Sequence, residues 1–229
     1  MTLTIYEDLE QGSPEWLQAR CGIVTASTVG KLLTSTGKVA NNDTSRNHMQ
    51  ALIAERITGR VEYTHPNRDM QRGTLLEPYA RDLYAAHYAP VDEVGFMRLD
   101  VGDGWSLGYS PDGLVGDDGL LEIKSRSPRI QINTIMFDRV PGANMAQLQA
   151  GLFVTGRDWI DYCSYSPGLP LYVKRVYPDK AWSTAIIQAV DAFTVTAREQ
   201  IQAFQMCANY LPTTEWFDPF EQEEEITFG

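Results

Sequence analysis

The chain has 229 residues, of which 43% are hydrophobic, and carries a formal net charge of −11 at pH 7. This length and composition are sufficient for one sizeable core, and no Pro-, Gly- or Ser-rich linker divides the chain, so we expect one domain. No apolar run approaches the roughly 18 residues of a membrane-spanning helix, and residues 1–4 lack the basic and apolar segments of a signal peptide, which predicts a cytoplasmic protein without a membrane anchor.

Acidic charge is concentrated at the C-terminal end of the chain. Residues 215–229 contain six Asp or Glu and no Lys or Arg, whereas residues 1–140 contain fourteen of the nineteen basic side chains. We therefore predict a folded domain over residues 1–214 and a solvated acidic tail over residues 215–229. The three cysteines, Cys21, Cys163 and Cys207, are odd in number and far apart, which is typical of free thiols and leaves too few thiolates for an iron–sulfur cluster.

Several segments of the N-terminal half have helical patterns. Thr25 or Ser27 can cap a short helix that ends near residue 33, and residues 43–58 have apolar side chains at helical spacing before Gly59. Residues 61–72 have no regular period, so we expect a loop that either connects two elements or lies on a phosphate backbone. Residues 74–88 predict a helix with Pro78 in its first turn. Its expected buried stripe consists of Leu76, Ala80, Leu83, Tyr84 and His87, with Glu77 one position beside it.

Strands dominate the segment that follows. Alternating patterns and turn residues predict strands over residues 93–100, 105–110, 113–116 and 119–125, joined as an antiparallel meander. A helix over residues 142–155, strands over 158–166 and 171–177 and a final helix over 182–208 complete the chain. This order of elements predicts an α/β fold with a mixed central sheet flanked by helices.

The segment Gly108–Leu114, followed by Leu121–Lys124, contains the most specific chemical pattern of the chain. Side chains alternate along a strand, so Glu122 and Lys124 point to one face while their apolar neighbours point into the core. A hairpin between the two segments brings Asp112 beside Glu122, and two carboxylates next to a lysine suit a hard cation. An acid-x-lysine strand and an SPDG turn are each common on solvated surfaces, and only their joint occurrence at this spacing favours a metal site.

This arrangement resembles the PD-(D/E)xK nuclease superfamily, with Asp112 as its aspartate and Glu122-Ile123-Lys124 as its E-x-K. Further blocks are similar to the YqaJ-type viral recombinase family, the group of lambda-exonuclease-like enzymes, and occur in the same order: Trp16–Arg20, Gly22–Ser27, Gly73–Glu77 and Ala146–Gln149. The matching blocks extend from residue 16 to residue 149 and say little about residues 180–229. The resemblance implies a restriction-endonuclease-like core.

The resemblance also assigns roles to individual residues. It implies a catalytic set of Glu77, Asp112, Glu122, Lys124 and Gln147, and a pocket for a 5′-terminal phosphate formed by Arg20, Ser27 and Ser110. The metal ligands would be the carboxylates of Glu77, Asp112 and Glu122 and the backbone carbonyl of Ile123, holding two Mg²⁺ ions, for which Mn²⁺ can substitute. Asp100 matches an acidic position of the family loosely. Without the resemblance, Glu77 is read as a first-turn acid, Gln147 as a solvent-facing residue, Arg20 as a surface residue and Ser27 as a helix cap.

The expected activity is Mg²⁺-dependent 5′-to-3′ exonuclease action on double-stranded DNA with 5′-phosphorylated ends, in a phage-type recombination system of a bacterial host. The resemblance further implies a ring of three subunits around DNA and a single-strand annealing protein as partner. A ring would explain how an acidic chain stays on DNA, because enclosure replaces electrostatic attraction. Two alternatives stay open: a structure-selective or restriction-type endonuclease with the same metal centre, and a non-catalytic DNA-end-binding accessory protein.

Overall fold

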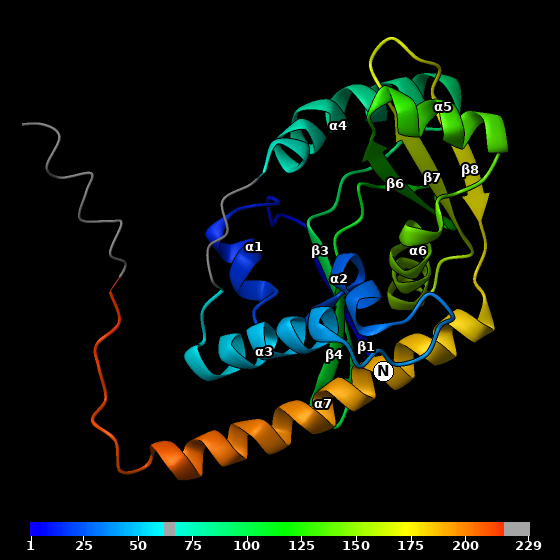
Figure 1. The fold of residues 1–229 in the computed structure, drawn as a ribbon. Coiled ribbons are helices and arrows are strands. Elements are labelled where there is room, and N and C mark those ends of the chain that lie inside the picture. Colours follow the sequence, from blue (N-terminus) through cyan, green and yellow to red (C-terminus); the bar gives the residue numbers. More distant parts are fainter. Residues whose placement is uncertain (62–66, 218–229) are drawn as a thin grey trace, which may run out of the picture.

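Two four-stranded sheets form the framework of the protein (Figure 1). The computed structural model describes residues 1–61 and 67–217. The first sheet has the order β1–β3–β4–β2 and the second the order β5–β6–β7–β8. The strands are β1 (Thr2–Tyr6), β2 (Val24–Thr25), β3 (Phe96–Gly102), β4 (Trp105–Tyr109), β5 (Gly113–Val115), β6 (Gly119–Ser125), β7 (Trp159–Tyr165) and β8 (Tyr172–Val176). β2 pairs with β4, and β6 with β7, in parallel, and the other pairs are antiparallel, which confirms the predicted mixed α/β class.

The division into two sheets corrects one expectation. β3 and β4, and β5 and β6, form antiparallel hairpins as predicted, but β4 and β5 lie in different sheets, so the predicted continuous meander is wrong. The chain passes from the first sheet to the second through Ser110, Pro111 and Asp112. Pro111 has no N–H and cannot extend a strand ladder, which favours the end of strand pairing at this point. Asp112 therefore lies at the junction of the two sheets.

The helices are α1 (Pro14–Ala19), α2 (Ala26–Val29), α3 (Asp43–Thr58), α4 (Arg68–His87), α5 (Pro128–Phe137), α6 (Gly142–Thr155) and α7 (Lys180–Ala208). α3 has its predicted bounds: the Asn42 side chain accepts a hydrogen bond from the Ser45 N–H at 2.9 Å, and Gly59 ends the helix with a φ of 69°. The bounds of α6 are also as predicted. α7 begins slightly before the predicted start, because the Asp179 side chain accepts from the Ala181 N–H and caps the helix.

α4 begins earlier than the sequence pattern indicated. Its first residue is Arg68 rather than residue 74, because the Asn67 side chain accepts from the Met70 N–H at 2.9 Å. Pro78 is consequently in the helix interior, and its predicted place in the first turn is wrong. Within the predicted stripe, Ala80 and Tyr84 are buried, whereas His87 in the last turn is exposed. Residues 62–66 of the predicted loop lie outside the described residues.

Four elements were missed by the sequence patterns, namely the strands β1 and β2 and the helices α1 and α5. Both helices begin with Ser followed by Pro, at Ser13 and at Ser127, and this cap-and-proline start is the signal that could have revealed them. β1 lies at the edge of the first sheet and leaves Leu3 and Ile5 partly exposed, so its alternation is weak.

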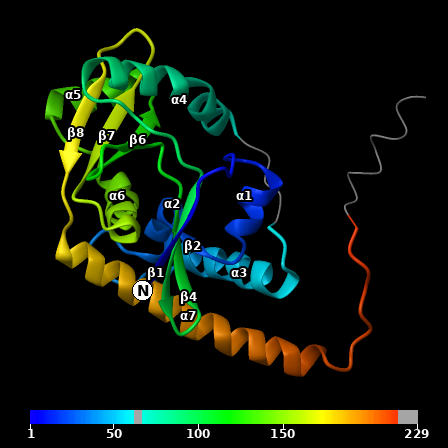
Figure 2. The same cartoon turned by 180° about the vertical axis from the view of Figure 1, so that it is seen from behind.

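α6 lies between the two sheets and contacts β3 and β4 of the first and β7 of the second. α7 packs against α3 and α6, while α4 and α5 lie at the opposite end of the molecule, on the second sheet (Figures 1 and 2). A second hydrophobic core, separate from the larger one around α6 and α7, packs Ala80 and Tyr84 of α4 on Leu121 and Ile123 of β6. The predicted inward orientation of Leu121 and Ile123 is thus confirmed, and β6 is buried on both faces because Glu122 is buried as well.

Within residues 1–61 and 67–217, no helix is both long and apolar enough to cross a membrane. Cys21, Cys163 and Cys207 are each free. Residues 218–229, most of the predicted acidic tail, lie outside the described residues.

His48 of α3 gives the fold a pH-dependent contribution to stability. Burial, assisted by repulsion from Lys31, lowers the pKa of the imidazole from 6.5 to about 4. The unfolded chain therefore binds a proton more readily, and the stability that neutral His48 contributes is present above pH 6.5 and lost as the pH falls toward 4. We expect the free energy of unfolding, measured by urea denaturation, to decrease over this window less steeply for His48→Gln than for the wild type. Equal slopes for the two proteins would contradict the assignment.

Candidate active site

The carboxylates predicted to be catalytic meet where the chain passes from the first sheet to the second. The register of the β5–β6 hairpin pairs Gly113 with Leu121, which puts Asp112 beside the next residues of β6. The Asp112 Oδ2 accepts a hydrogen bond from the Ile123 N–H at 2.6 Å. Asp112 and Glu122 are therefore neighbours, as the sequence pattern predicted.

Glu122 is only 1% exposed and is held by three side chains. Its Oε1 accepts hydrogen bonds from the Lys124 Nζ, at 2.5 Å, and from the Gln147 Nε2. Its Oε2 accepts from the Tyr109 hydroxyl at 3.0 Å. These donors come from β6, α6 and β4, so the two sheets and the helix between them converge on one carboxylate.

Tyr109 is a further residue of the site, which the sequence motifs did not predict. It is fully buried at the end of β4, and its ring fills the space beside Gly151 of α6, where a Cβ would lie 2.8 Å from the Tyr109 Cζ. A larger residue at position 151 would therefore push the ring away from Glu122. A buried tyrosine hydroxyl needs a hydrogen-bond partner, and its position two residues before the Pro-Asp pair was the signal that could have identified it.

Glu77 joins the cluster from α4. The Arg81 Nη2 binds the Glu77 Oε1 at 2.5 Å, and the Arg81 Nε donates to the Asp112 carbonyl at 3.0 Å, so Arg81 fixes one predicted ligand relative to the other. One open cleft of about 600 Å³ is lined by Glu77, Asp112, Ile123 and Lys124. Arg81 was not predicted from the sequence as a site residue, although its position one turn after Glu77 favours an ion pair.

The charges of this cluster are not balanced by its own cations. Desolvation and repulsion from Glu122 raise the pKa of Asp112 well above its usual value. Burial also raises the pKa of Glu77, against the attraction of Arg81 and with a smaller contribution from Glu122. Burial alone would lower the pKa of Lys124, but attraction to Glu122 and Asp112 outweighs it, so the pKa is raised and the ammonium group stays charged. The cluster therefore favours an additional positive charge.

The donor atoms fit a hard divalent cation. Mg²⁺ accepts carboxylate and carbonyl oxygens as ligands. The predicted ligands provide these groups, as the carboxylates of Glu77, Asp112 and Glu122 and the backbone carbonyl of Ile123. Among the residues that the structure describes, no three Asp, Glu, His or Cys side chains form a ready-made ligand group. The carboxylate oxygens instead accept hydrogen bonds from neighbouring protein donors, so metal binding requires exchange of some of these bonds.

The residues predicted to bind a 5′-terminal phosphate do not line this cleft themselves, but Ser110 lies two positions before Asp112, which does. Parallel pairing of β2 with β4 lets the segments that lead to Ser27 and Ser110 leave the sheet at the same end. The Arg20 guanidinium lies over the Trp16 ring, with Cζ 3.7 Å from the centroid, and the Trp16 Nε1 donates to the Ser110 Oγ at 2.9 Å. The Ser27 Oγ lies 3.1 Å from the Thr25 Oγ1. Arg20 and Ser110 are thus linked through Trp16, and Ser27 lies on the adjoining segment.

Asp100 is not brought to this site. It pairs with Ser106 across β3 and β4, toward the end of the first sheet that is remote from Ser110, and it forms an ion pair with Arg98 at 2.8 Å. Met70 and Arg72, by contrast, line the cleft with the carboxylates, and the Arg72 Nε donates to the Ser125 Oγ at 3.3 Å. This part of the predicted loop is the first turns of α4.

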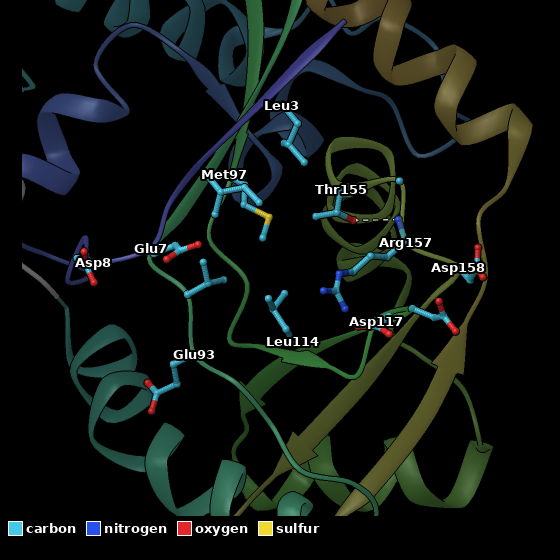
Figure 3. Close-up of a pocket in the computed structure, with 14 residues that line it drawn as sticks. Leu3, Glu7, Asp8, Glu93, Met97, Leu114, Asp117, Thr155, Arg157 and Asp158 are labelled. Carbon is cyan, nitrogen blue, oxygen red and sulfur yellow. Dashed lines mark hydrogen bonds between the residues drawn. The ribbon is translucent and has the colours of Figure 1, made fainter.

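A second hollow, of about 620 Å³, lies between β1, β3 and the turn that joins β5 to β6 (Figure 3). One basic residue lines it, Arg157, whose Nη1 donates to the Gly116 and Gly119 carbonyls at 2.7 Å. Its acidic lining residues are Glu7, Asp8, Glu93, Asp117, Asp118 and Asp158. This lining repels phosphate. The cleft at the carboxylate cluster is less acidic, because three basic residues, Arg72, Lys124 and Arg126, line it beside the acidic residues Asp69, Glu77 and Asp112.

Comparison with known proteins identifies the family and supports the fold. A family model described as the YqaJ-like viral recombinase domain matches residues 15–158. The crystal structure of an alkaline exonuclease (LHK-Exo) from Laribacter hongkongensis is 36% identical to the chain, with a TM-score of 0.77, covering 87% of this chain and 100% of that one. The structure of LHK-Exo in complex with dAMP gives the same values.

A phage-related exonuclease from Haemophilus somnus 129PT shares the fold, with a TM-score of 0.59, 12% identity and coverage of 80% of this chain and 96% of that one. A search of the curated proteins found no match. The family model spans more than half of the chain and includes both hairpins that meet at Asp112, so the protein belongs to the YqaJ-like viral recombinase family, as its sequence motifs indicated.

Proposed function

We propose that the protein is a Mg²⁺-dependent exonuclease that hydrolyses double-stranded DNA in the 5′-to-3′ direction from 5′-phosphorylated ends, in a phage-type recombination system. The observation that carries the proposal is a cleft lined by Glu77, Asp112 and Lys124, together with the buried Glu122 that Lys124 and Gln147 both bind. Membership of the viral recombinase family supports a role in recombination, and the relative at 36% identity is named as an alkaline exonuclease.

Two Mg²⁺ ions, or Mn²⁺ in their place, would be held by the carboxylates of Glu77, Asp112 and Glu122 and the carbonyl of Ile123. When bound, the ions supply an acidic water as nucleophile and neutralise charge on the scissile phosphate. Burial and repulsion between the carboxylates raise the pKa of Asp112 and of Glu77. The excess negative charge of the cluster therefore favours binding of the metal ions.

The protein side chains position the reacting groups. Lys124 stays protonated beside Glu122 and faces the cleft, where its ammonium group can stabilise negative charge that develops on the phosphate. Gln147 and Tyr109 hold opposite oxygens of Glu122 and so fix its orientation. Arg81 does the same for Glu77.

Recognition of a 5′-terminal phosphate by Arg20, Ser27 and Ser110 would set the direction of digestion. A guanidinium group binds phosphate through paired N–H donors, and hydroxyl groups add further donors. Ser110 precedes Asp112 by one proline, so a phosphate bound there lies close to the carboxylates. LHK-Exo has been crystallised with dAMP, a 5′-mononucleotide of the kind that stepwise hydrolysis from a 5′ end releases.

We further propose that three subunits form a ring around DNA and that the enzyme acts with a single-strand annealing protein in the cytoplasm of a bacterial host. The support for these proposals is the family membership. Native mass spectrometry of the full chain gives the subunit number directly, and a mass other than that of three chains would reject the ring.

The activity is tested by nucleotide release from linear duplex DNA that is labelled at either the 5′ or the 3′ end. We expect Mg²⁺-dependent release of the 5′ label first, inhibition by EDTA and no cleavage of closed circular DNA. Cleavage of the circle would favour the endonuclease alternative. Binding of DNA ends without hydrolysis in Mg²⁺ or Mn²⁺ would favour an accessory protein.

Replacing Arg20 with Ala tests the phosphate pocket. We expect kcat/KM to fall about tenfold or more on 5′-phosphorylated duplexes, because a charge-assisted hydrogen-bond pair is lost, with a much smaller change on 5′-hydroxyl duplexes. Arg46→Ala is a suitable control, because Arg46 is exposed and pairs with Asp43. Equal losses on both substrates would remove Arg20 from the phosphate pocket.

A further inference from the structure

Trp16 of α1 is a large aromatic residue that contacts two residues of the proposed phosphate pocket from one ring. Its Nε1 donates to the Ser110 Oγ at 2.9 Å. Its face lies 3.7 Å below the Arg20 Cζ. Arg20 is four residues further along the chain, whereas Ser110 is 94 positions away, so the indole connects a local partner with a remote one.

Core packing does not account for Trp16. Neither of the two hydrophobic clusters of the described residues contains it, among either their buried members or the side chains packed against them. α1 itself has no buried residue and is only six residues long, beginning at the Ser13 cap and Pro14. Trp16 thus lies outside both hydrophobic clusters, and its side chain contacts the two pocket residues Ser110 and Arg20.

The hydrogen bond to Trp16 determines what Ser110 can offer a ligand. An indole N–H is only a donor, so the Ser110 oxygen must act as its acceptor. The Ser110 O–H is then left to point elsewhere as a donor. A serine hydroxyl oriented in this way is matched to a phosphate oxygen, which only accepts.

The stacking contact has a similar effect on Arg20. A guanidinium group that lies flat on an aromatic ring keeps its N–H donors directed outward in the plane of the group. Within residues 1–61 and 67–217, Arg20 forms no ion pair. Burial lowers the pKa of Arg20 to about 10, against the attraction of Glu55, so the group is still charged at neutral pH. The stacking contact with Trp16 thus holds a charged guanidinium group with its N–H donors in fixed directions.

We propose that Trp16 is the positioning residue that sets specificity for the 5′-phosphorylated end, by orienting the Arg20 guanidinium and the Ser110 hydroxyl as one donor set. This inference rests on the proposed recognition of a 5′-phosphate. Beyond that recognition, the preference for 5′-phosphorylated over 5′-hydroxyl ends would depend on the Trp16 indole N–H, which does not itself contact the phosphate.

The test compares wild type and Trp16→Phe on matched duplexes with 5′-phosphate or 5′-hydroxyl ends. Phenylalanine keeps an aromatic face under Arg20 but removes the N–H. We expect the phosphate-to-hydroxyl ratio of kcat/KM to fall about fivefold, the effect of losing one oriented hydrogen bond, mainly through a higher KM on phosphorylated ends. Trp182→Phe, on a tryptophan packed against the main core, is the matched control and should change thermal stability without changing the ratio.

A double-mutant cycle separates orientation from folding. With Ser110 already replaced by Ala, the Trp16→Phe change should have little further effect on the ratio, because the N–H has lost its partner. Fluorescence anisotropy of duplex binding in Ca²⁺ gives the same comparison without turnover, so a variant with low activity can still be measured.

Three outcomes would overturn the inference. If Trp16→Phe keeps the wild-type ratio while Arg20→Ala lowers it, the phosphate pocket stands and the role of Trp16 is wrong. If Trp16→Phe lowers kcat/KM equally on 5′-phosphate and 5′-hydroxyl duplexes, the residue has only a structural role. The same conclusion holds if Trp16→Phe lowers the phosphate-to-hydroxyl ratio as strongly in the Ser110→Ala background as in the wild type. If the wild type itself does not discriminate between the two ends, the proposed phosphate recognition fails and the inference fails with it.

Discussion

Replacing Asp112 with Asn is expected to abolish DNA hydrolysis, with a loss in kcat of about a thousandfold or more, since a neutral amide cannot hold a divalent cation as a carboxylate does. Glu122→Gln should have an effect of the same order. Both variants keep the size and shape of the side chain and remove its negative charge, and one acceptor oxygen becomes an NH2 donor. In Glu122→Gln this donor replaces an oxygen that accepts from Tyr109 or from Lys124 and Gln147. Nucleotide release from 5′-phosphorylated linear duplex in Mg²⁺ and in Mn²⁺ measures the loss.

The same variants distinguish a catalytic role from a structural one. Burial and the proximity of Glu122 raise the pKa of Asp112, which means that its ionised form costs stability. Asp112→Asn should therefore unfold at the same temperature as the wild type or at a higher one, and it should still bind DNA ends. Asp138→Asn, on an exposed carboxylate that pairs with Lys174, is the control and should remain fully active. Activity of Asp112→Asn above a few per cent of the wild type would reject the metal-binding role.

Replacing Lys124 with Ala is expected to lower kcat about a hundredfold or more, which is the effect of removing one preorganised donor to developing charge. The Lys124 ammonium lies 2.5 Å from Glu122 and at the wall of the cleft, so its removal also leaves a buried carboxylate without its cation. We therefore expect a lower melting temperature as well as slower hydrolysis, and the rate must be measured well below that temperature. KM for DNA should change much less than kcat.

Lys174→Ala is the matched control for this change. Lys174 also binds a carboxylate, Asp138, at 2.7 Å, but it is 42% exposed and lies on β8, away from the cleft. It should affect neither kcat nor KM. Lys124→Arg keeps the positive charge with a different shape and should recover stability more fully than rate. A Lys124→Ala enzyme with the wild-type kcat would remove the ammonium group from the mechanism.

The hollow beside β1 and the cleft at the carboxylate cluster differ in local charge. The formal charge of −11 belongs to the whole sequence, but its acids are unevenly placed. One hollow is lined by six acids and one engaged arginine, whereas the cleft at the carboxylate cluster is lined by three acids and three basic side chains. Local charge near the site therefore matters more for phosphate than the net charge, because surface charges are screened over about 8 to 10 Å at physiological ionic strength.

Much of the local structure could be predicted because it depends on residues that are close in the sequence. The Asn42 cap and the Gly59 stop define α3, and alternation along β6 put Leu121 and Ile123 in the core. The pairing of Asp112 with Ile123 also follows from a short hairpin. By the same reasoning, the Asn67 cap could have placed the start of α4 correctly, but the lack of periodicity in the preceding segment concealed it.

The sequence by itself determined the chemical character of the protein: the carboxylates and lysine of one hairpin, the helices with clear caps, and the motifs of its family. Only the tertiary structure decided that the strands form two sheets, that Tyr109 and Gln147 hold Glu122 from different elements, and that Trp16 connects Arg20 with Ser110. The physical reason is the distance along the sequence over which each kind of interaction acts. Caps, turns and strand alternation act over a few residues, whereas contacts between distant segments depend on how α6 packs between the sheets, and no local pattern records that packing.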